Sequence, residues 1–256
     1  MLLAIDIGNT NIVCGAFRGD ALAAKWRLAT RPDRTADEYG LDCVQLARLR
    51  GLEPESVRAV AVASVVPSLD AVIERMCRTY FQREPLFVNA GNQRILQVDY
   101  RPPADVGADR IVNAAAAYRK HGGPLVVLDF GTATTLDAVS RDGVFLGGAI
   151  APGIHLAAEA LASRTARLPR VAFAKPPQPI GRSTLEGIQS GLYYGHLFLV
   201  EGLVKLFRES LGAGARVIAT GGLSDALGGD LPWVDEREPD LTLEGLYYIY
   251  RSNTDG

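Results

Sequence analysis

Residues 2–11 read Leu2-Leu3-Ala4-Ile5-Asp6-Ile7-Gly8-Asn9-Thr10-Asn11. A related stretch, at residues 126–135, reads Val126-Val127-Leu128-Asp129-Phe130-Gly131-Thr132-Ala133-Thr134-Thr135. Each copy is a short apolar run, typical of a buried strand, with an acidic residue and then a glycine among hydroxyl or amide side chains. Because glycine lets backbone amides approach an anion and a carboxylate can hold a hydrated cation, each copy predicts a phosphate-binding turn.

Taken alone, each turn also fits an ordinary hairpin of an α/β protein. The sequence contains no Gly-x-x-x-x-Gly-Lys-Ser/Thr run, so the commonest phosphate loop is absent. A third candidate turn, Thr220-Gly221-Gly222, follows an apolar run and precedes an expected helix. The order of the three turns along the chain favours phosphate binding over three unrelated hairpins.

The composition is that of a globular protein. With 256 residues, 48% of them hydrophobic, the chain can bury a full core in one large domain or two small ones. The formal charge of -2 gives no support to a nucleic acid or a membrane surface as partner, because both favour a basic face. No apolar stretch is long enough to span a bilayer, and Met1 leads straight into an expected strand, so we expect a cytoplasmic protein. We also expect buried free thiols at Cys14, Cys43 and Cys77, and no zinc site.

The hydrophobic pattern predicts an α/β fold with mixed sheets flanked by helices. The expected strands are 2–7, 12–17, 22–28, 59–66, 85–88, 125–129, 135–139, 144–150 and 216–219. The expected helices are 35–50, 68–81, 110–121, 153–163, 184–210 and one near 222–227. Because the second series repeats the first, we expect two duplicated halves, 1–120 and 121–256, with the last helix able to pack back on the first half.

These features resemble the superfamily of actin, sugar kinases, acetate kinase and the heat-shock chaperone ATPases. The resemblance rests on the Asp-x-Gly turn with a nearby threonine in each half, and on the late Gly-Gly turn. It implies two ribonuclease H-like halves with ATP in the cleft between them. The first and second turns would contact the phosphates, and the third would lie near the nucleoside.

Five motifs more closely resemble type III pantothenate kinases. They are residues 6–11, 107–110, 129–134, 147–153 and 182–191, and the likeness continues to a final helix near 239–246. The resemblance implies transfer of the γ-phosphoryl group of ATP to the terminal hydroxyl of pantothenate, the first step of coenzyme A synthesis. It further implies magnesium, a monovalent cation (potassium or ammonium) and a homodimer.

The resemblance also implies a role for each site residue. Asp6 would hold magnesium, directly or through water, and Asp129 would lie near the monovalent cation. The implied ATP-binding residues are Asp6, Ile7, Gly8, Asn9, Thr10, Asn11, Ile12, Val13 and Thr132. The implied pantothenate-binding residues are Tyr100, Gly107, Ala108, Asp109, Arg110 and Thr184. Phosphoryl transfer needs charge neutralisation and positioning more than covalent chemistry, and these residue types supply both.

Asp109 is the implied base or hydroxyl-orienting group, and it has an ordinary alternative. It precedes an alanine-rich helix, where an Asp can simply cap the free amides. A capping environment stabilises the carboxylate and weakens it as a base, so we expect Asp109 to orient the hydroxyl as much as deprotonate it. The alternatives for its neighbours are a surface salt bridge for Arg110, a rim aromatic for Tyr100 and a helix cap for Thr184.

Other functions of the same superfamily remain open. An ATP-driven switch or filament subunit shares the two turns, but such proteins carry inserted subdomains, for which 256 residues leave little room. A sugar kinase or a polyphosphate-cleaving phosphatase would have another acceptor, whereas residues 107–110 offer one carboxylate and one guanidinium, which better suit a single hydroxyl and an anionic acceptor. A regulatory protein that keeps the fold is a further alternative, and the near-neutral charge is unfavourable to direct DNA binding. The glycine-spaced segment 187–195 is expected to pack in the core or at a dimer interface, with the core as the default.

Overall fold

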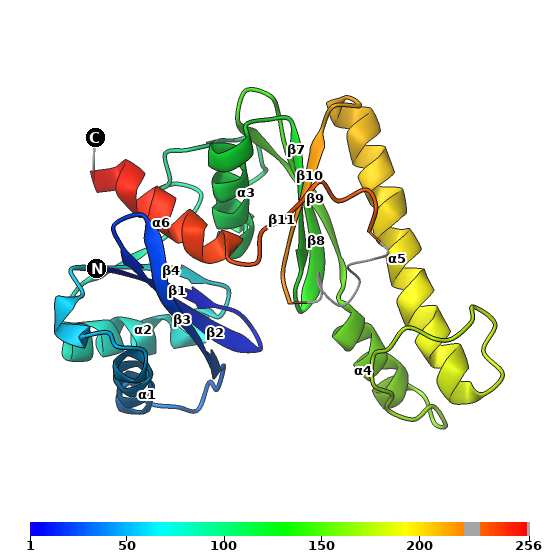
Figure 1. The fold of residues 1–256 in the computed structure, drawn as a ribbon, viewed down its shortest axis with the longest axis horizontal. Helices are drawn as coiled ribbons and strands as arrows, with labels where there is room; N and C mark the ends of the chain where they lie inside the picture. Colours follow the sequence, from blue (N-terminus) through cyan, green and yellow to red (C-terminus); the bar gives the residue numbers. More distant parts are fainter. Residues whose placement is uncertain (223–230, 255–256) are drawn as a thin grey trace. The chain divides into compact units, whose positions relative to one another are not determined.

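The computed structural model describes residues 1–222 and 231–254. The chain divides into two compact units (Figure 1), unit 1 being Met1–Lys120 with Asp240–Gly256 and unit 2 being His121–Pro239. Each unit is built on a mixed β-sheet with helices packed against it. Among the described residues, no helix has the length and apolar character needed to cross a membrane.

The sheet of unit 1 has the strand order β3-β2-β1-β4-β5. Its strands are β1 (Leu2–Ile7), β2 (Asn11–Arg18), β3 (Ala21–Ala29), β4 (Ala59–Ser64) and β5 (Pro85–Phe87). The first three are antiparallel neighbours, whereas β4 runs parallel to β1 and β5 parallel to β4. Nearly every residue of β1 is buried, because helices cover both faces of the sheet, and its sequence is therefore a continuous apolar run.

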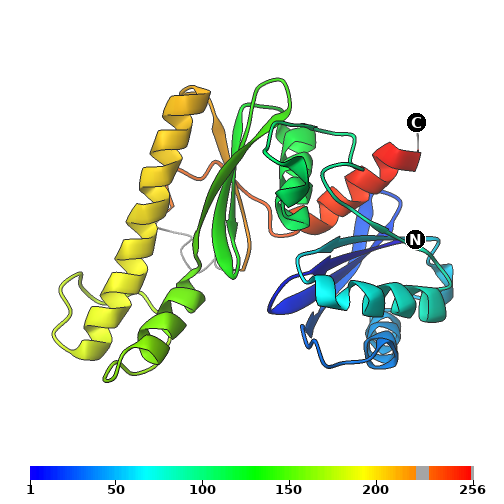
Figure 2. The ribbon, with the colours of Figure 1, turned by 180° about the vertical axis from the view of Figure 1, so that it is seen from behind.

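Four helices belong mainly to unit 1. They are α1 (Ala36–Leu49), α2 (Pro67–Met76), α3 (Ala108–His121) and α6 (Leu241–Thr254), with short 3-10 turns at Pro54–Ser56 and Pro103–Asp105. Figures 1 and 2 show α1 and α2 on one face of the sheet and α6 on the other. The last helix packs against β1 and β4, and Gly245 lets it approach α3, since a Cβ there would lie 2.3 Å from the Val112 carbonyl oxygen.

Unit 2 repeats this plan. Its strands are β7 (Leu125–Phe130), β8 (Ala133–Val139), β9 (Val144–Pro152), β10 (Arg216–Thr220) and β11 (Glu236–Arg237). β7, β8 and β9 are antiparallel neighbours, and β10 and β11 are added in parallel beyond β7. The order β9-β8-β7-β10-β11 is that of β3-β2-β1-β4-β5, so the predicted duplication is confirmed in the sheet topology.

Among the described residues of unit 2, two helices cover the sheet. They are α4 (Ile154–Arg164) and α5 (Thr184–Leu211), which contact one another and the sheet. Figure 2 shows both on the same side of the sheet. Side chains from α5 and from β7, β8 and β10 form one apolar cluster beneath them.

The structure departs from the expected elements in a few places. The helix expected at 68–81 ends at Met76 and continues as a π-helix, Cys77–Phe81. The two-residue strands β6 (Gln97–Val98) and β11 were not expected. The helix expected near 222–227 lies, beyond residue 222, outside the described residues. The expectation for the cysteines is confirmed, since Cys14, Cys43 and Cys77 are buried free thiols.

Candidate functional site

The first turn, residues 8–11, joins β1 to β2 at the end of the unit 1 sheet. Gly8 donates its amide to the Asn11 carbonyl at 3.0 Å. Thr30, which directly follows β3, supports the turn by donating its hydroxyl to the Gly8 carbonyl at 2.6 Å and its amide to the Thr10 carbonyl at 3.0 Å. The side chains of Asn9 and Thr10 are exposed. The turn is thus held by its own backbone and the neighbouring strand, with its tip accessible to a ligand.

Asp6 lies just before this turn, paired in register with Val13 on one side and Ala63 on the other. It is half-buried, as expected for a carboxylate at a strand end. Two of the implied ATP-binding residues, Ile7 and Ile12, point their side chains into the core cluster of unit 1. Ile7 and Ile12 therefore offer only backbone groups to a ligand.

The second turn, residues 131–132, joins β7 to β8 in unit 2. Gly131 donates its amide to the Ala133 carbonyl, and Gly153 donates its amide to the Thr132 carbonyl, both at 3.1 Å. Gly153 packs so closely that a Cβ there would lie 2.4 Å from the Thr132 carbonyl oxygen. The side chain of Thr132 itself is exposed. Backbone hydrogen bonds therefore hold this turn too, and its tip is accessible to a ligand.

The third turn meets the second at Asp129. Thr220 of β10 is paired in parallel register with Asp129 of β7, so the next residue, Gly221, lies beside the Asp129 carboxylate. Gly221 has φ of 89°, and a Cβ there would lie 2.5 Å from Asp129 Oδ1 and 2.6 Å from the Phe130 backbone. Only glycine fits this place without strain. The contact of Gly221 with Asp129 was not predicted from the order of the motifs in the sequence.

The segment at residues 107–110 leads into α3. The helix begins at Ala108, and the Gly107 carbonyl accepts the Ile111 amide at 3.2 Å. Asp109 therefore lies inside the first turn rather than at the cap position, and its Oδ1 accepts the Arg110 amide at 2.7 Å. Burial raises the pKa of Asp109, while the hydrogen bond from the Arg110 amide and the Arg110 charge oppose the rise. The amide hydrogen bonds lower the pKa of Asp109, as expected for a capping environment, but desolvation is the larger effect and the net direction is upward.

Arg110 and Tyr100 are brought together in unit 1. The guanidinium carbon of Arg110 lies 5.8 Å from the centroid of the Tyr100 ring, within the range of a cation–π contact. Arg110 is only 6% exposed, so the surface salt bridge considered for it does not describe its environment. Thus Tyr100, Asp109 and Arg110 form one cluster at the start of α3.

Thr184 is the first residue of α5 in unit 2, and its side chain is exposed. The cap of this helix is Ser183, whose hydroxyl accepts the Glu186 amide at 3.2 Å. The interpretation of Thr184 as a helix cap is therefore wrong. Its hydroxyl is accessible at the helix N-terminus.

Sequence reasoning missed a polar pair beside the first turn. Ser64 ends β4 and is paired in register with Ile7, and its hydroxyl donates to Asp70 Oδ1 of α2 at 2.5 Å. A serine that ends an apolar strand shortly before a helix start was a usable signal, since Asp6 and Asp129 were singled out by their positions at strand ends. This pair adds a second carboxylate close to the strand that carries Asp6.

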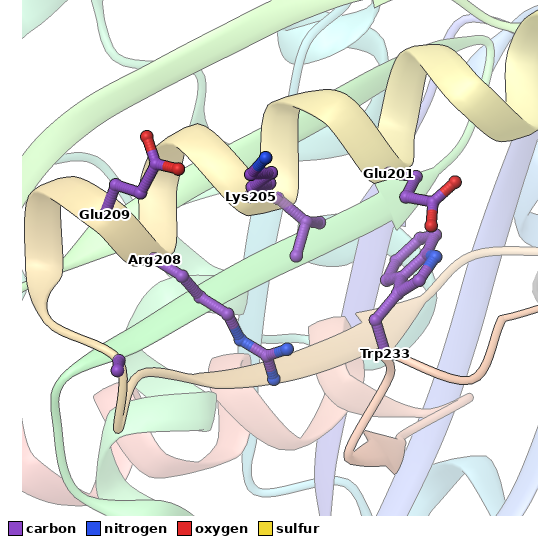
Figure 3. A pocket seen from close by; sticks show the side chains of 7 residues that line it. Glu201, Lys205, Arg208, Glu209 and Trp233 are labelled. Carbon is purple, nitrogen blue, oxygen red and sulfur yellow. The ribbon is translucent and has the colours of Figure 1, made fainter.

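A cavity of about 600 Å³ lies elsewhere in unit 2, along the last turns of α5 (Figure 3). Val204, Ala213 and Trp233 form its apolar lining, and charged side chains of α5 surround them. Ala213 precedes the start of β10, whereas the third turn follows its end. None of the implied site residues lines this cavity.

Comparison with known proteins identifies the family. A family model described as type III pantothenate kinase matches residues 2–206. The type III pantothenate kinase of Moorella thermoacetica is 47% identical over 99% of this chain and 100% of its own length, and that of Anaeromyxobacter sp. (strain Fw109-5) is 48% identical with the same coverage. Among solved structures, a putative 2-dehydro-3-deoxygalactonokinase from Sinorhizobium meliloti matches with a TM-score of 0.61 at 14% identity, covering 98% of this chain and 96% of its own, which shows a shared fold. The chain therefore belongs to the type III pantothenate kinase family.

Proposed function

We propose that this protein transfers the γ-phosphoryl group of ATP to the terminal hydroxyl of pantothenate, the first step of coenzyme A synthesis. The observation that carries the proposal is membership of the family across nearly the whole chain. Each of the first three motifs includes a turn or a helix start, at residues 8–11, 131–132 and 107–108, and the side chains of Asn9, Thr10 and Thr132 are exposed there. We place the enzyme in the cytoplasm, where ATP and the later steps of the pathway are available.

Phosphate binding falls to the two turns. In unit 1 the backbone of residues 8–11 and the exposed side chains of Asn9 and Thr10 would receive phosphate oxygens. Asp6 would hold magnesium, directly or through water, because a half-buried carboxylate beside such a turn suits a hydrated divalent cation. In unit 2 the exposed hydroxyl of Thr132 would add a phosphate contact. Charge neutralisation of this kind provides most of the catalysis in phosphoryl transfer.

Acceptor binding falls to the cluster at the start of α3. Asp109 would accept the proton of the pantothenate hydroxyl or orient that hydroxyl, and its raised pKa favours the first role. Arg110 would bind the pantothenate carboxylate through its planar fork, with the Tyr100 ring in cation–π range of the guanidinium. Backbone groups of Gly107 and Ala108, and the accessible hydroxyl of Thr184, would complete the pantothenate site.

A monovalent cation, potassium or ammonium, would lie near Asp129. Backbone carbonyl oxygens can replace the hydration shell of potassium, and Gly221 brings backbone next to Asp129 Oδ1. The Asp129→Ala variant is expected to lose stimulation by potassium, as measured by turnover across a potassium titration with sodium as control. An unchanged potassium response would place the ion elsewhere.

A homodimer is supported by the outer face of α5. The side chains of Phe198 and Leu206 are 61% and 57% exposed. On the same helix, a Cβ built at Gly187, Gly191 or Gly195 would contact nothing within 4 Å. An apolar, glycine-spaced helical face left open in one protomer suits close packing against a second copy.

One assay tests the acceptor assignment. Purified protein is given ATP, magnesium and potassium with a panel of acceptors, and ADP release is coupled to a spectrophotometric readout. Pantothenate is expected to support turnover, with the phosphorylated product identified by mass spectrometry. Phosphorylation of sugars with no response to pantothenate would overturn the assignment and favour a sugar kinase.

A further inference from the structure

Unit 2 contains a buried polar pair to which the proposed function assigns no role. Thr134 Oγ1 and His196 Nε2 lie 3.1 Å apart, and the two residues are 1% and 8% exposed. Tyr193 and Val200, about one turn to either side of His196 on α5, belong to the apolar cluster of the unit. Because an unpaired polar group is costly in such surroundings, the hydrogen bond holds β8 and α5 in one arrangement.

The pair lies directly beside the second turn. Thr134 is opposite Phe130 in the register of β7 and β8, and the turn at residues 131–132 lies between these two residues. His196 meets both of them, through the hydrogen bond to Thr134 and through a ring contact with Phe130 at 6.0 Å between centroids. One side chain of α5 therefore contacts both ends of the turn.

The protonation state of His196 suits a residue that orients a neighbouring side chain. Burial lowers the pKa of His196, so at neutral pH the ring carries no charge and keeps one donor and one acceptor nitrogen. A neutral ring contributes little to neutralising phosphate charge. It can, however, fix the rotamer of a threonine hydroxyl, which both donates and accepts.

We propose that His196 is a positioning residue for ATP binding. Through Thr134 it fixes the second turn, and with it Thr132, in the arrangement that receives a phosphate of the nucleotide. The proposal rests on the phosphate contact of Thr132 in the proposed function. It assigns to His196 no contact with either substrate.

Three variants test the proposal: Thr134→Val, His196→Leu and the double variant. Each single variant leaves one polar group unpaired in the core and is expected to lose thermal stability, whereas the double variant removes both partners and regains much of it. The KM for ATP is expected to rise about fivefold to tenfold in all three, the change that loss of one hydrogen bond produces. The KM for pantothenate is expected to stay unchanged.

Two controls separate positioning from stability. Val200→Ala lies about one turn further along α5 and creates a cavity in the same cluster, so it is expected to lower Tm without raising the KM for ATP. His196→Gln keeps a hydrogen-bonding amide at similar reach and is expected to retain most of the ATP affinity. A double variant that folds stably and keeps the wild-type KM for ATP would show that the pair is merely structural.

Calorimetric titration of ATP without pantothenate makes the test independent of the acceptor. If the wild-type protein binds ATP but phosphorylates another acceptor, the proposed function fails while the positioning role is still decided by the ATP Kd of the variants. If the wild-type protein does not bind ATP, both proposals are overturned.

Discussion

Asp109 is a single charged residue in surroundings that disfavour its charge. Its burial raises its pKa, and the Arg110 amide and guanidinium only partly offset that effect. Because the folded pKa lies above the unfolded one, the folded state binds the proton more tightly, and the free energy of unfolding falls as pH rises through this range. The ionised carboxylate therefore costs stability at neutral pH, while its higher proton affinity suits a base.

From this we predict opposite effects of Asp109→Asn on stability and on turnover. The neutral amide is expected to keep or raise the Tm at neutral pH and to lower kcat about a hundredfold or more, the usual contribution of a positioned base. Circular dichroism melting and the coupled kinase assay measure the two effects. Asp105→Asn, an exposed carboxylate in the same segment, is the matched control and is expected to change neither. A stable Asp109→Asn enzyme with full activity would remove Asp109 from the chemistry.

At the residue scale, the sequence was informative where a side chain lies at the end of an element. Asp6 and Asp129 were singled out in this way, because strand ends are visible in the hydrophobic pattern, whereas the role predicted for Asp109 came from the family resemblance. The contact of Arg110 with Tyr100 was not predicted, since it joins a helix to a loop of no regular pattern. The direction of the Asp109 pKa was also missed, because burial depends on the packing of the whole unit.

At the scale of elements, the third turn tolerates no side chain at Gly221, because its φ is positive and its Cβ position is already occupied. We predict that Gly221→Ala lowers stability by about 1–3 kcal/mol, since it forces a non-glycine residue to positive φ. It should also lower kcat, because the new Cβ would displace the Asp129 carboxylate or the Phe130 backbone. Urea unfolding and the kinase assay measure the two effects.

A substitution at a second glycine tests whether backbone strain alone, without displacement of Asp129, lowers kcat. Gly212 also has positive φ, 103°, but a Cβ there would contact nothing within 4 Å. Gly212→Ala is therefore expected to lose stability and keep its kcat. Equal losses of kcat in the two variants would mean that displacement of Asp129 is not the cause.

The long elements were predictable and the short ones were not, for a physical reason. Strands such as β1 and helices such as α5 repeat a pattern over enough residues to be recognised, whereas β6 and β11 have two residues each. The final helix expected near 239–246 extends further, since α6 continues to Thr254. Asn253 donates its side-chain amide to the Asn92 carbonyl at 2.9 Å, a long-range contact that composition does not show.

At the scale of the whole molecule, the duplication accounts for the paired turns and the sequence predicted it. The order of strands is the same in both units, so each Asp-x-Gly turn occupies the same connection in its own sheet. The sequence predicted the surroundings of segment 187–195 only in part. Ile188, Leu192 and Tyr193 are buried as the default expectation required, but the glycines of the segment face open space.

The open face of α5 leads to a prediction about assembly. Phe198 is the most exposed large apolar side chain of this helix, and a hot-spot residue near the centre of an interface contributes about 2 kcal/mol or more. Phe198→Glu places a charge there and is expected to raise the dimer Kd by about 30-fold or more, which sedimentation velocity over a range of concentrations measures. Leu49→Glu, an equally apolar and more exposed position on α1, is the control and is expected to leave the dimer intact. A wild-type protein that sediments as a monomer at all concentrations, or a Phe198→Glu variant with the wild-type Kd, would show that α5 is not the interface.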